Sequence, residues 1–145
     1  MEHKIPLLID TDPGVDDALA LLMAFKSESH RLLGLCITAG NVGLGHTCAN
    51  ALKLCEVAGI DVPVYPGCAQ PLVFAAEDAS YVHGRDGFGD VGYLPAQRGL
   101  QSEHAALAII RSRTSGARPS QPASPPTWRQ NASMAPASPP AARPS

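Results

Sequence analysis

The chain has 145 residues and a formal net charge of -2, and 45% of its residues are hydrophobic. This length and composition suffice for one domain of ordinary size. The charge balance gives no support for a nucleic-acid-binding protein, which normally carries a basic surface. The apolar runs are too short to span a membrane, and no secretory signal precedes them. The four cysteines lack zinc-site spacing, so we expect reduced thiols that mostly pack as small hydrophobes in a cytoplasmic protein.

Apolar runs alternate with turn residues over the first part of the chain. Strands are expected at residues 5–9, 32–38 and 62–67, and helices at about 16–25, 45–58 and 104–111, with a long polar loop over 70–102. This order of strands and helices is typical of an α/β fold. We therefore predict a parallel, Rossmann-like sheet with helices on both faces.

Composition changes near Arg111. Residues 112–145 contain eight of the 14 prolines, many serines and alanines, and no acidic residue. Such a segment cannot bury enough apolar surface to offset the entropy lost on ordering. We therefore divide the chain into an ordered domain, residues 1–111, and a disordered Pro/Ser/Ala/Arg-rich tail, residues 112–145.

Four aspartates fall within eight residues after the first predicted strand: Asp10, Asp12, Asp16 and Asp17. No lysine or arginine between Lys4 and Lys26 offsets their charge. A turn and a helix cap would explain one or two of them, each cap being worth about 1 kcal/mol. The others would add repulsion and lost hydration at the end of a buried strand. Because carboxylate-rich sites suit calcium or magnesium, we favour a divalent-metal site over a capped turn.

The carboxyl ends of the predicted strands should bring further polar residues to the same place. Ligands of open parallel sheets bind at this edge. Asn41 follows the second strand, and the third strand leads into the glycine-rich segment 81–90, which contains His83. His83 could be an acid, a base or a hydrogen-bond partner of a ligand, although a lone loop histidine more often has no such role. We expect one pocket to collect the aspartates, Asn41 and this loop.

Together these motifs resemble the inosine-uridine preferring nucleoside hydrolase family. Its signature D-x-D-P-G-x-D-D-A is complete at residues 10–18, and an A-G-N turn, a V-P-V-Y-x-G run and an H-G-x-D-G loop follow at 39–41, 62–67 and 83–87. The resemblance covers about residues 4–111. It implies a nucleosidase that uses water to cleave the N-glycosidic bond of a purine or pyrimidine ribonucleoside, such as inosine or uridine, with Ca²⁺ as cofactor.

By motif position, the resemblance implies a role for each candidate residue. Asp12 would ligate calcium and accept a proton from the attacking water. Asp17 would be the second carboxylate ligand, and Asp10 would support the metal site. Asp16 would accept hydrogen bonds from the ribose hydroxyls, and Asn41 would make a further contact with the ribose or the water.

His83, by the same resemblance, would lie beside the base and take part in protonating the leaving group. Members of this family normally have longer chains, and the part with no match here supplies more metal ligands, ribose contacts and the main histidine of leaving-group protonation. We therefore expect a weak or inactive catalyst. The alternatives are a non-catalytic fragment that binds calcium, or one that associates with a full-length paralogue. A homo-oligomer would also suit the family, and the sequence does not indicate a base preference.

Overall fold

A parallel sheet of three strands lies at the centre of the computed structural model, which describes residues 4–73, 75 and 79–114. The strands are β1 (Ile5–Thr11), β2 (His30–Ile37) and β3 (Val64–Pro66), and they lie in the order β1-β2-β3. Both neighbouring pairs run parallel. The predicted parallel α/β sheet is therefore confirmed.

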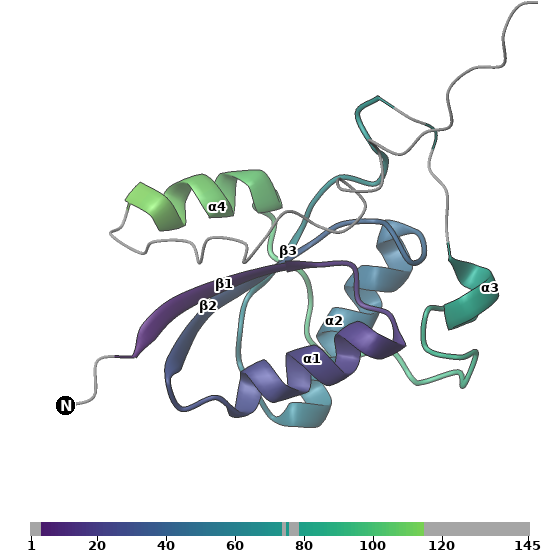
Figure 1. The fold of residues 1–145 in the computed structure, drawn as a ribbon, viewed down its shortest axis with the longest axis horizontal. Coiled ribbons are helices and arrows are strands. Elements are labelled where there is room, and N and C mark those ends of the chain that lie inside the picture. The colour runs from purple at the N-terminus through teal and green to yellow at the C-terminus, as the bar shows by residue number, and fades with distance from the viewer. Residues whose placement is uncertain (1–3, 74, 76–78, 115–145) are drawn as a thin grey trace, which may run out of the picture.

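Helices cover both faces of this sheet, as the sequence predicted. Helices α1 (Val15–Lys26) and α2 (Leu44–Ala58) pack on one face, and α4 (Ala105–Thr114) packs on the other (Figure 1). The short helix α3 (Ser80–His83) belongs to the connection between β3 and α4. Within the described residues, no helix is both long and apolar enough to cross a membrane.

Several boundaries differ from the predicted ones. Strand β1 continues past residue 9 because Asp10 and Thr11 remain paired with β2. The prediction of one loop over 70–102 is wrong at α3, whose four residues are too few to show a helical period. Helix α4 continues to Thr114, beyond the predicted end of the ordered domain. Residues 115–145 lie outside the described residues, so the disordered tail stays a prediction.

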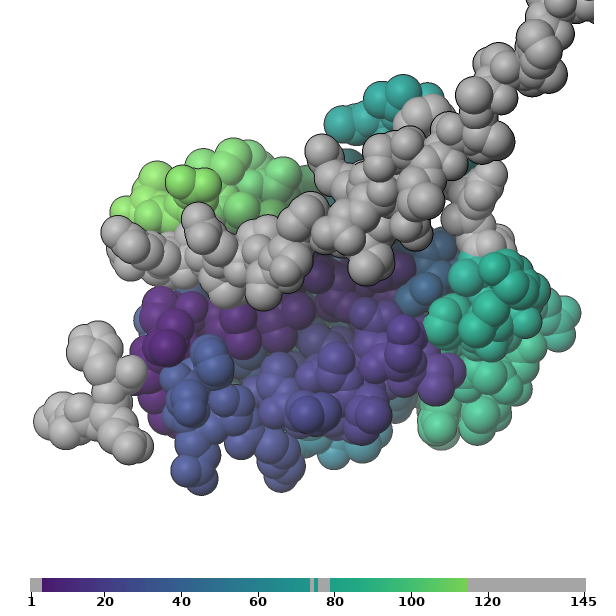
Figure 2. All heavy atoms as spheres, in the orientation of Figure 1, coloured from purple at the N-terminus to yellow at the C-terminus, as the bar shows by residue number. Residues whose placement is uncertain are grey.

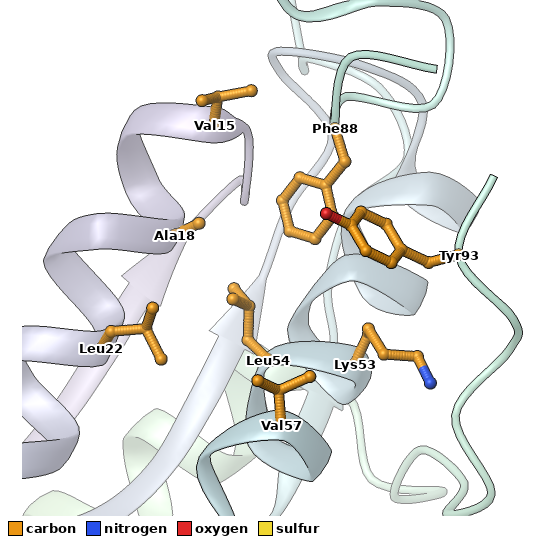
Figure 3. Close-up of a pocket in the computed structure, with 8 residues that line it drawn as sticks. All are labelled: Val15, Ala18, Leu22, Lys53, Leu54, Val57, Phe88 and Tyr93. Carbon is orange, nitrogen blue, oxygen red and sulfur yellow. The ribbon is translucent and has the colours of Figure 1, made fainter. Parts of the chain in front are cut away.

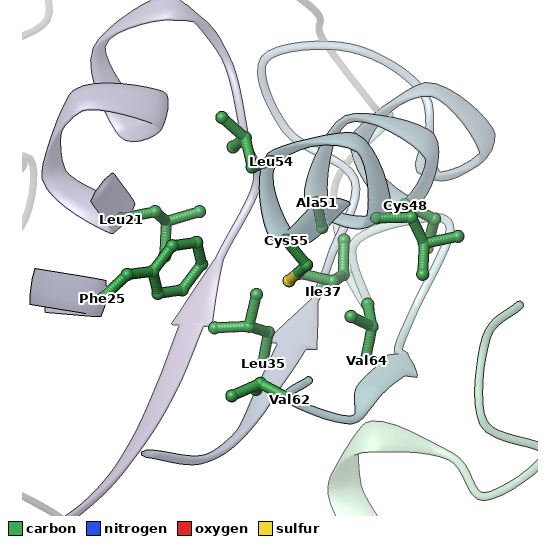
Figure 4. Packing of buried hydrophobic residues seen from close by; sticks show 11 residues of the cluster. Leu21, Phe25, Leu35, Ile37, Cys48, Ala51, Leu54, Cys55, Val62 and Val64 are labelled. Atoms are coloured by element: carbon green, nitrogen blue, oxygen red, sulfur yellow. The ribbon is translucent and has the colours of Figure 1, made fainter. Parts of the chain in front are cut away.

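Strand β2 supplies apolar side chains to both faces of the sheet. Leu35 and Ile37 point into the core beneath α1 and α2, whereas Cys36 lies in a smaller cluster beneath α4. Figure 4 shows the larger cluster: Leu21, Phe25, Leu35, Ile37, Cys48, Ala51, Leu52, Leu54, Cys55, Val62 and Val64. Burial on both faces explains why this strand reads as a continuous apolar run rather than an alternating one.

Candidate active site

The connection between β1 and α1 carries the acidic cluster at the carboxyl edge of the sheet. Asp12 follows the end of β1, and Asp16 and Asp17 lie in the first turn of α1, where the helix dipole favours negative charge. The Gly14 N–H donates to Asp17 Oδ2 over 3.3 Å. Helix capping therefore accounts for part of the role of Asp17, but it does not explain the presence of Asp12 and Asp10.

Asn41, in the segment that follows β2, forms hydrogen bonds with Asp12 and Asp17. Its backbone N–H donates to Asp12 Oδ2 over 2.8 Å, and its side-chain Nδ2 donates to the Asp12 backbone oxygen and to Asp17 Oδ2, both over 2.9 Å. The Thr11 hydroxyl donates to Asp17 Oδ1 over 2.8 Å. The structure thus brings together three residues predicted from the sequence. Among the described residues, no lysine or arginine forms an ion pair with Asp12 or Asp17.

His83 reaches the same edge from α3. Its Nδ1 lies 3.7 Å from Asp16 Oδ1, and its side chain is 13% exposed, whereas that of Asp16 is 78% exposed. A Cβ at Gly14 would lie 3.0 Å from His83 Nδ1 and 2.8 Å from Asn41 Nδ2, so only glycine lets both side chains approach this closely. Figure 2 shows the atoms of the α3 segment packed against the start of α1. His83 and Asp16 therefore form a pair at the rim of the cluster.

Two of the carboxyl groups have raised pKa values. The pKa of Asp12 is raised mainly by loss of hydration, with the charges of Asp17 and Asp16 acting in the same direction, although the Asn41 N–H opposes them. The pKa of Asp10 is raised first by loss of hydration and then by the charge of Asp12. Raised acid pKa values at one edge of a sheet mark a place where added positive charge would be stabilising.

Asp10 lies apart from the other aspartates in one respect. It lies two residues after Leu8 on β1, so its side chain shares a face of the sheet with Leu8, which packs in the cluster beneath α4. The charge of Asp10 also contributes to the raised pKa of the buried Cys36. Its side chain is thus directed toward the α4 face, while Thr11 and Asp17 meet on the side of α1. Asp10 acts on Asp12 through charge rather than through a shared hydrogen bond.

The donor set fits calcium in its chemistry but only in part in its number. All the candidate donors are carboxylate or amide oxygens, which calcium prefers, but calcium takes about 6–8 of them. Within residues 4–73, 75 and 79–114, no group of three or more His, Cys, Asp or Glu side chains is arranged to hold a metal ion. The described residues would therefore supply part of a coordination shell.

Asn50 is a residue of this region that the sequence reasoning missed. It lies on α2 and is 7% exposed. Its Nδ2 donates to the backbone oxygen of Pro13 over 3.0 Å and to the backbone oxygen of Asp86 over 2.9 Å. The sequence offers only a weak signal, a polar residue between the apolar residues Cys48 and Ala51 of a predicted helix. Its burial and its hydrogen-bond partners depend on tertiary packing.

A separate apolar cavity of about 320 Å³ lies between α1, α2 and the segment after α3 (Figure 3). Its walls are Val15, Ala18, Leu22, Lys53, Leu54, Val57, Phe88 and Tyr93. Lys53 is paired with Glu56 over 2.6 Å, and Phe88 and Tyr93 meet edge to face. This cavity contains none of the candidate site residues, so the acidic cluster remains the candidate site.

Comparison with known proteins agrees with the motifs. The family model for inosine-uridine preferring nucleoside hydrolase matches residues 7–125, which extends beyond the predicted domain end at residue 111. Uridine nucleosidase 1 of Arabidopsis thaliana is 46% identical over 102 residues, which are 69% of this chain and 30% of the relative. The pyrimidine-specific ribonucleoside hydrolase RihB of Escherichia coli is 40% identical over 108 residues, or 74% of this chain and 34% of the relative.

A solved structure gives the same answer for the fold. The purine-preferring ribonucleoside hydrolase from Gardnerella vaginalis matches with a TM-score of 0.71 and 32% identity, over 75% of this chain and 36% of that one. The chain thus spans about a third of the length of the curated relatives it matches. The family model covers most of the chain, and the fold and the ordered motifs agree with it. The protein therefore belongs to the inosine-uridine preferring nucleoside hydrolase family.

Proposed function

We propose that this protein acts on ribonucleosides and cleaves their N-glycosidic bond with water, as a weak catalyst when the chain is alone. The observation that carries the proposal is the joining of Asp12 and Asp17 by Asn41 at the carboxyl edge of the sheet. The names of the matched relatives include both purine-preferring and pyrimidine-specific enzymes. The proposal therefore covers ribonucleosides of both classes.

Each candidate residue has a proposed task that suits its place. Asp12 would accept the proton of the attacking water, since its raised pKa makes it a better base than an ordinary aspartate. Asp16 is 78% exposed, so its carboxylate can accept hydrogen bonds from ribose hydroxyls. Asn41 would orient Asp12 and contact the ribose or the water. His83 would lie beside the base and assist departure of the leaving group.

We further propose that Asp12 and Asp17 would hold a calcium ion, with Asp10 supporting it by charge. When bound, the cation would offset the repulsion between the carboxylates and polarise a water molecule. Because the described residues supply only part of a shell, loss of the other groups would remove most transition-state stabilisation. This is why we expect slow hydrolysis, or none, from the chain alone.

The test combines calcium calorimetry with hydrolysis assays on inosine and uridine, using the purified chain and Asp12→Ala. We expect calcium binding and any slow hydrolysis to be lost in the variant. Glu28→Ala removes one exposed carboxylate elsewhere and should behave as the wild type. Hydrolysis that survives in Asp12→Ala would contradict the role of Asp12. Hydrolysis at the rate of a full-length relative would contradict the proposed weakness, and absence of calcium binding would contradict the metal role.

The free side of β1 favours a second function, association with a full-length paralogue. The Ile5 N–H donates to Ser29 O, and Thr11 O accepts from Thr38 N–H, so the backbone N–H and C=O groups of the odd-numbered residues of β1 point toward β2. The backbone groups of the even-numbered residues point away from β2, and within the described residues no strand pairs with that side. Within the described residues this edge is unpaired, and the outward N–H groups of Leu8 and Asp10 are available to another strand.

Co-purification with a full-length relative, followed by hydrogen exchange of β1, tests this second function. We expect the amides of Leu8 and Asp10, which face away from β2, to exchange more slowly in the complex than in the free chain. A monodisperse monomer that does not bind the relative would exclude association through this edge.

A further inference from the structure

The loop that carries His83 is attached to the site at both of its ends. At its start, the Ala79 N–H donates to the backbone oxygen of Asn41 over 2.9 Å. At its end, the backbone oxygen of Asp86 accepts a hydrogen bond from Asn50 Nδ2 over 2.9 Å. His83 lies between these two attachments, so its position depends on both.

Asn50 connects this loop to the turn that carries the aspartates. The same Nδ2 group donates to the Pro13 oxygen over 3.0 Å, so one amide uses both of its hydrogens on two segments that are far apart in the sequence. Asn50 is 7% exposed; its bond to the Pro13 oxygen is buried, and its bond to the Asp86 backbone oxygen is partly buried. Losing this donor leaves the buried Pro13 oxygen without its partner.

The backbone of the His83 loop also approaches the Asn50 side-chain amide closely. Gly87 has φ +80°, and a Cβ there would lie 2.9 Å from both Asn50 Nδ2 and Val42 Cγ2. The backbone of the loop can therefore come within hydrogen-bonding distance of Asn50 only because residue 87 lacks a side chain. A shift of the loop would move His83 relative to Asp16, since their 3.7 Å separation joins the loop to α1.

We propose that Asn50 is a positioning residue of the site: its side-chain amide fixes the His83 loop against the Pro13–Gly14 turn and thereby keeps the His83 imidazole beside Asp16. The importance of this pair for catalysis rests on the proposed function. The positioning itself does not, because it follows from contacts that exist without substrate. Among the described residues, the side-chain amide of Asn50 donates to the Pro13 and Asp86 backbone oxygens and to none of the proposed metal-binding or ribose-binding side chains, so it acts through the segments that it joins.

The test measures the His83–Asp16 contact directly by NMR of the histidine rings in the full chain, at one fixed pH. The ring resonance of His83 is assigned by its disappearance in His83→Gln. In the wild type, Asp16→Asn should shift this resonance, because the carboxylate lies 3.7 Å from the ring. In the Asn50→Leu background we expect the shift to fall at least several-fold. In the Cys55→Ala background, which alters the buried face of α2 without touching the loop, the shift should stay at its wild-type size.

A pair of glycine variants tests the same contact from the loop side and covers the case in which Asn50→Leu does not fold. Gly87 and Gly59 both have positive φ, +80° and +65°, so alanine strains the backbone at either position. Only at Gly87 would the new Cβ meet Asn50, since nothing lies within 4 Å of one at Gly59, which caps the end of α2. We expect Gly87→Ala, but not Gly59→Ala, to abolish the response of His83 to Asp16→Asn.

Retention of the full response in Asn50→Leu or Gly87→Ala would overturn the proposal, and so would an equal loss in Gly59→Ala. Parallel assays of inosine and uridine hydrolysis report on the proposed function separately. A chain that shows the expected NMR pattern but never hydrolyses a nucleoside would support the positioning role and contradict the activity. If the wild type hydrolyses nucleosides but Asn50→Leu leaves the NMR response unchanged, the activity is supported and the positioning role is contradicted.

Discussion

Asn41 and Asp17 are 24 residues apart in the sequence, and a hydrogen bond of 2.9 Å from Nδ2 to Oδ2 joins them. The same amide also donates to the backbone oxygen of Asp12. One neutral side chain therefore supplies the donors that hold the β1–α1 turn against the segment after β2. In this arrangement the carboxylates are held by hydrogen bonds, and their charge remains available to a cation.

Replacing Asn41 with leucine should destabilise the fold, because two hydrogen bonds are lost and the Asp12 oxygen and Asp17 carboxylate lose a donor. We expect the free energy of unfolding to fall by about 1–2 kcal/mol, as for other partly buried polar groups left without a partner. Urea denaturation followed by circular dichroism measures this. His46→Leu, at an exposed position of α2, is the control and should change stability by less than about 0.5 kcal/mol. Equal effects of the two variants would show that the Asn41 amide contributes nothing specific.

Gly40→Ala should disturb the position of Asp12 with little effect elsewhere. A Cβ at this position would collide with the Asp12 carboxylate, whereas a Cβ at Gly45 on α2 would meet nothing within 4 Å. We expect calcium affinity, measured by calorimetry, to fall about 10–100-fold in Gly40→Ala, as when a group that orients a metal ligand is altered. Gly45→Ala should bind calcium as the wild type does. Unchanged affinity in Gly40→Ala would mean that Asp12 is not a ligand.

The sequence was sufficient to predict the sheet and most of this cluster, because both leave strong local signals. Continuous apolar runs mark strands that are buried on two faces, and the carboxyl ends of parallel strands meet at one edge. These two facts place Asp12, Asp17 and Asn41 together before any coordinates are known. The structure adds the donors, since a hydrogen bond between distant residues has no periodicity to reveal it.

Asn50 and α3 show why the rest could not be predicted. Asparagine on a helix usually faces solvent, and only the packing of α2 against two separate loops turns this one inward. Helix α3 has four residues and is attached through the Asn41 backbone oxygen, so its existence depends on a distant segment. The position of His83 thus depends on tertiary contacts rather than on the H-G-x-D-G loop alone.

The cysteines should differ sharply in reactivity. Cys36, Cys48 and Cys55 are buried, as expected for thiols that pack as small hydrophobes, but Cys68 is exposed. Burial, with smaller contributions from the charges of Asp10 and Glu103, raises the pKa of Cys36 to about 11. Because the thiolate is the reactive form, iodoacetamide at neutral pH should label Cys68 in the native chain and leave Cys36 unmodified until urea is added. Peptide mass spectrometry measures the labelling, and rapid modification of native Cys36 would contradict its burial.

Protonation of Asp12 should stabilise the fold in the absence of metal. Loss of hydration raises the pKa of Asp12 above its usual value of 3.8, so in the window just above 3.8 the folded state binds more protons than the unfolded state. The contribution of Asp12 to stability therefore falls as the pH rises through this window. Asp12→Asn removes the titrating group and keeps an oxygen that can accept the Asn41 N–H. We expect urea midpoints to show the variant gaining stability relative to the wild type as the pH is raised from about 3 to 7.

Carboxyl groups away from the cluster do not affect this comparison, and Asp10, whose pKa the charge of Asp12 helps to raise, changes it in the same direction. The pKa values of Glu56, Asp86 and Glu103 are lowered, in each case first by a hydrogen bond to the carboxylate, so their contributions to stability run in the opposite direction. They are present in both proteins and cancel in the difference.

Calcium at 100 times its dissociation constant should stabilise the wild type at neutral pH by about 2.7 kcal/mol and the Asp12→Asn variant far less. A difference in stability between the two proteins that stays constant with pH would show that Asp12 has the same pKa in the folded and unfolded chains. The acidic cluster would then not disfavour the ionised form of Asp12, and a cation would have no such effect to offset.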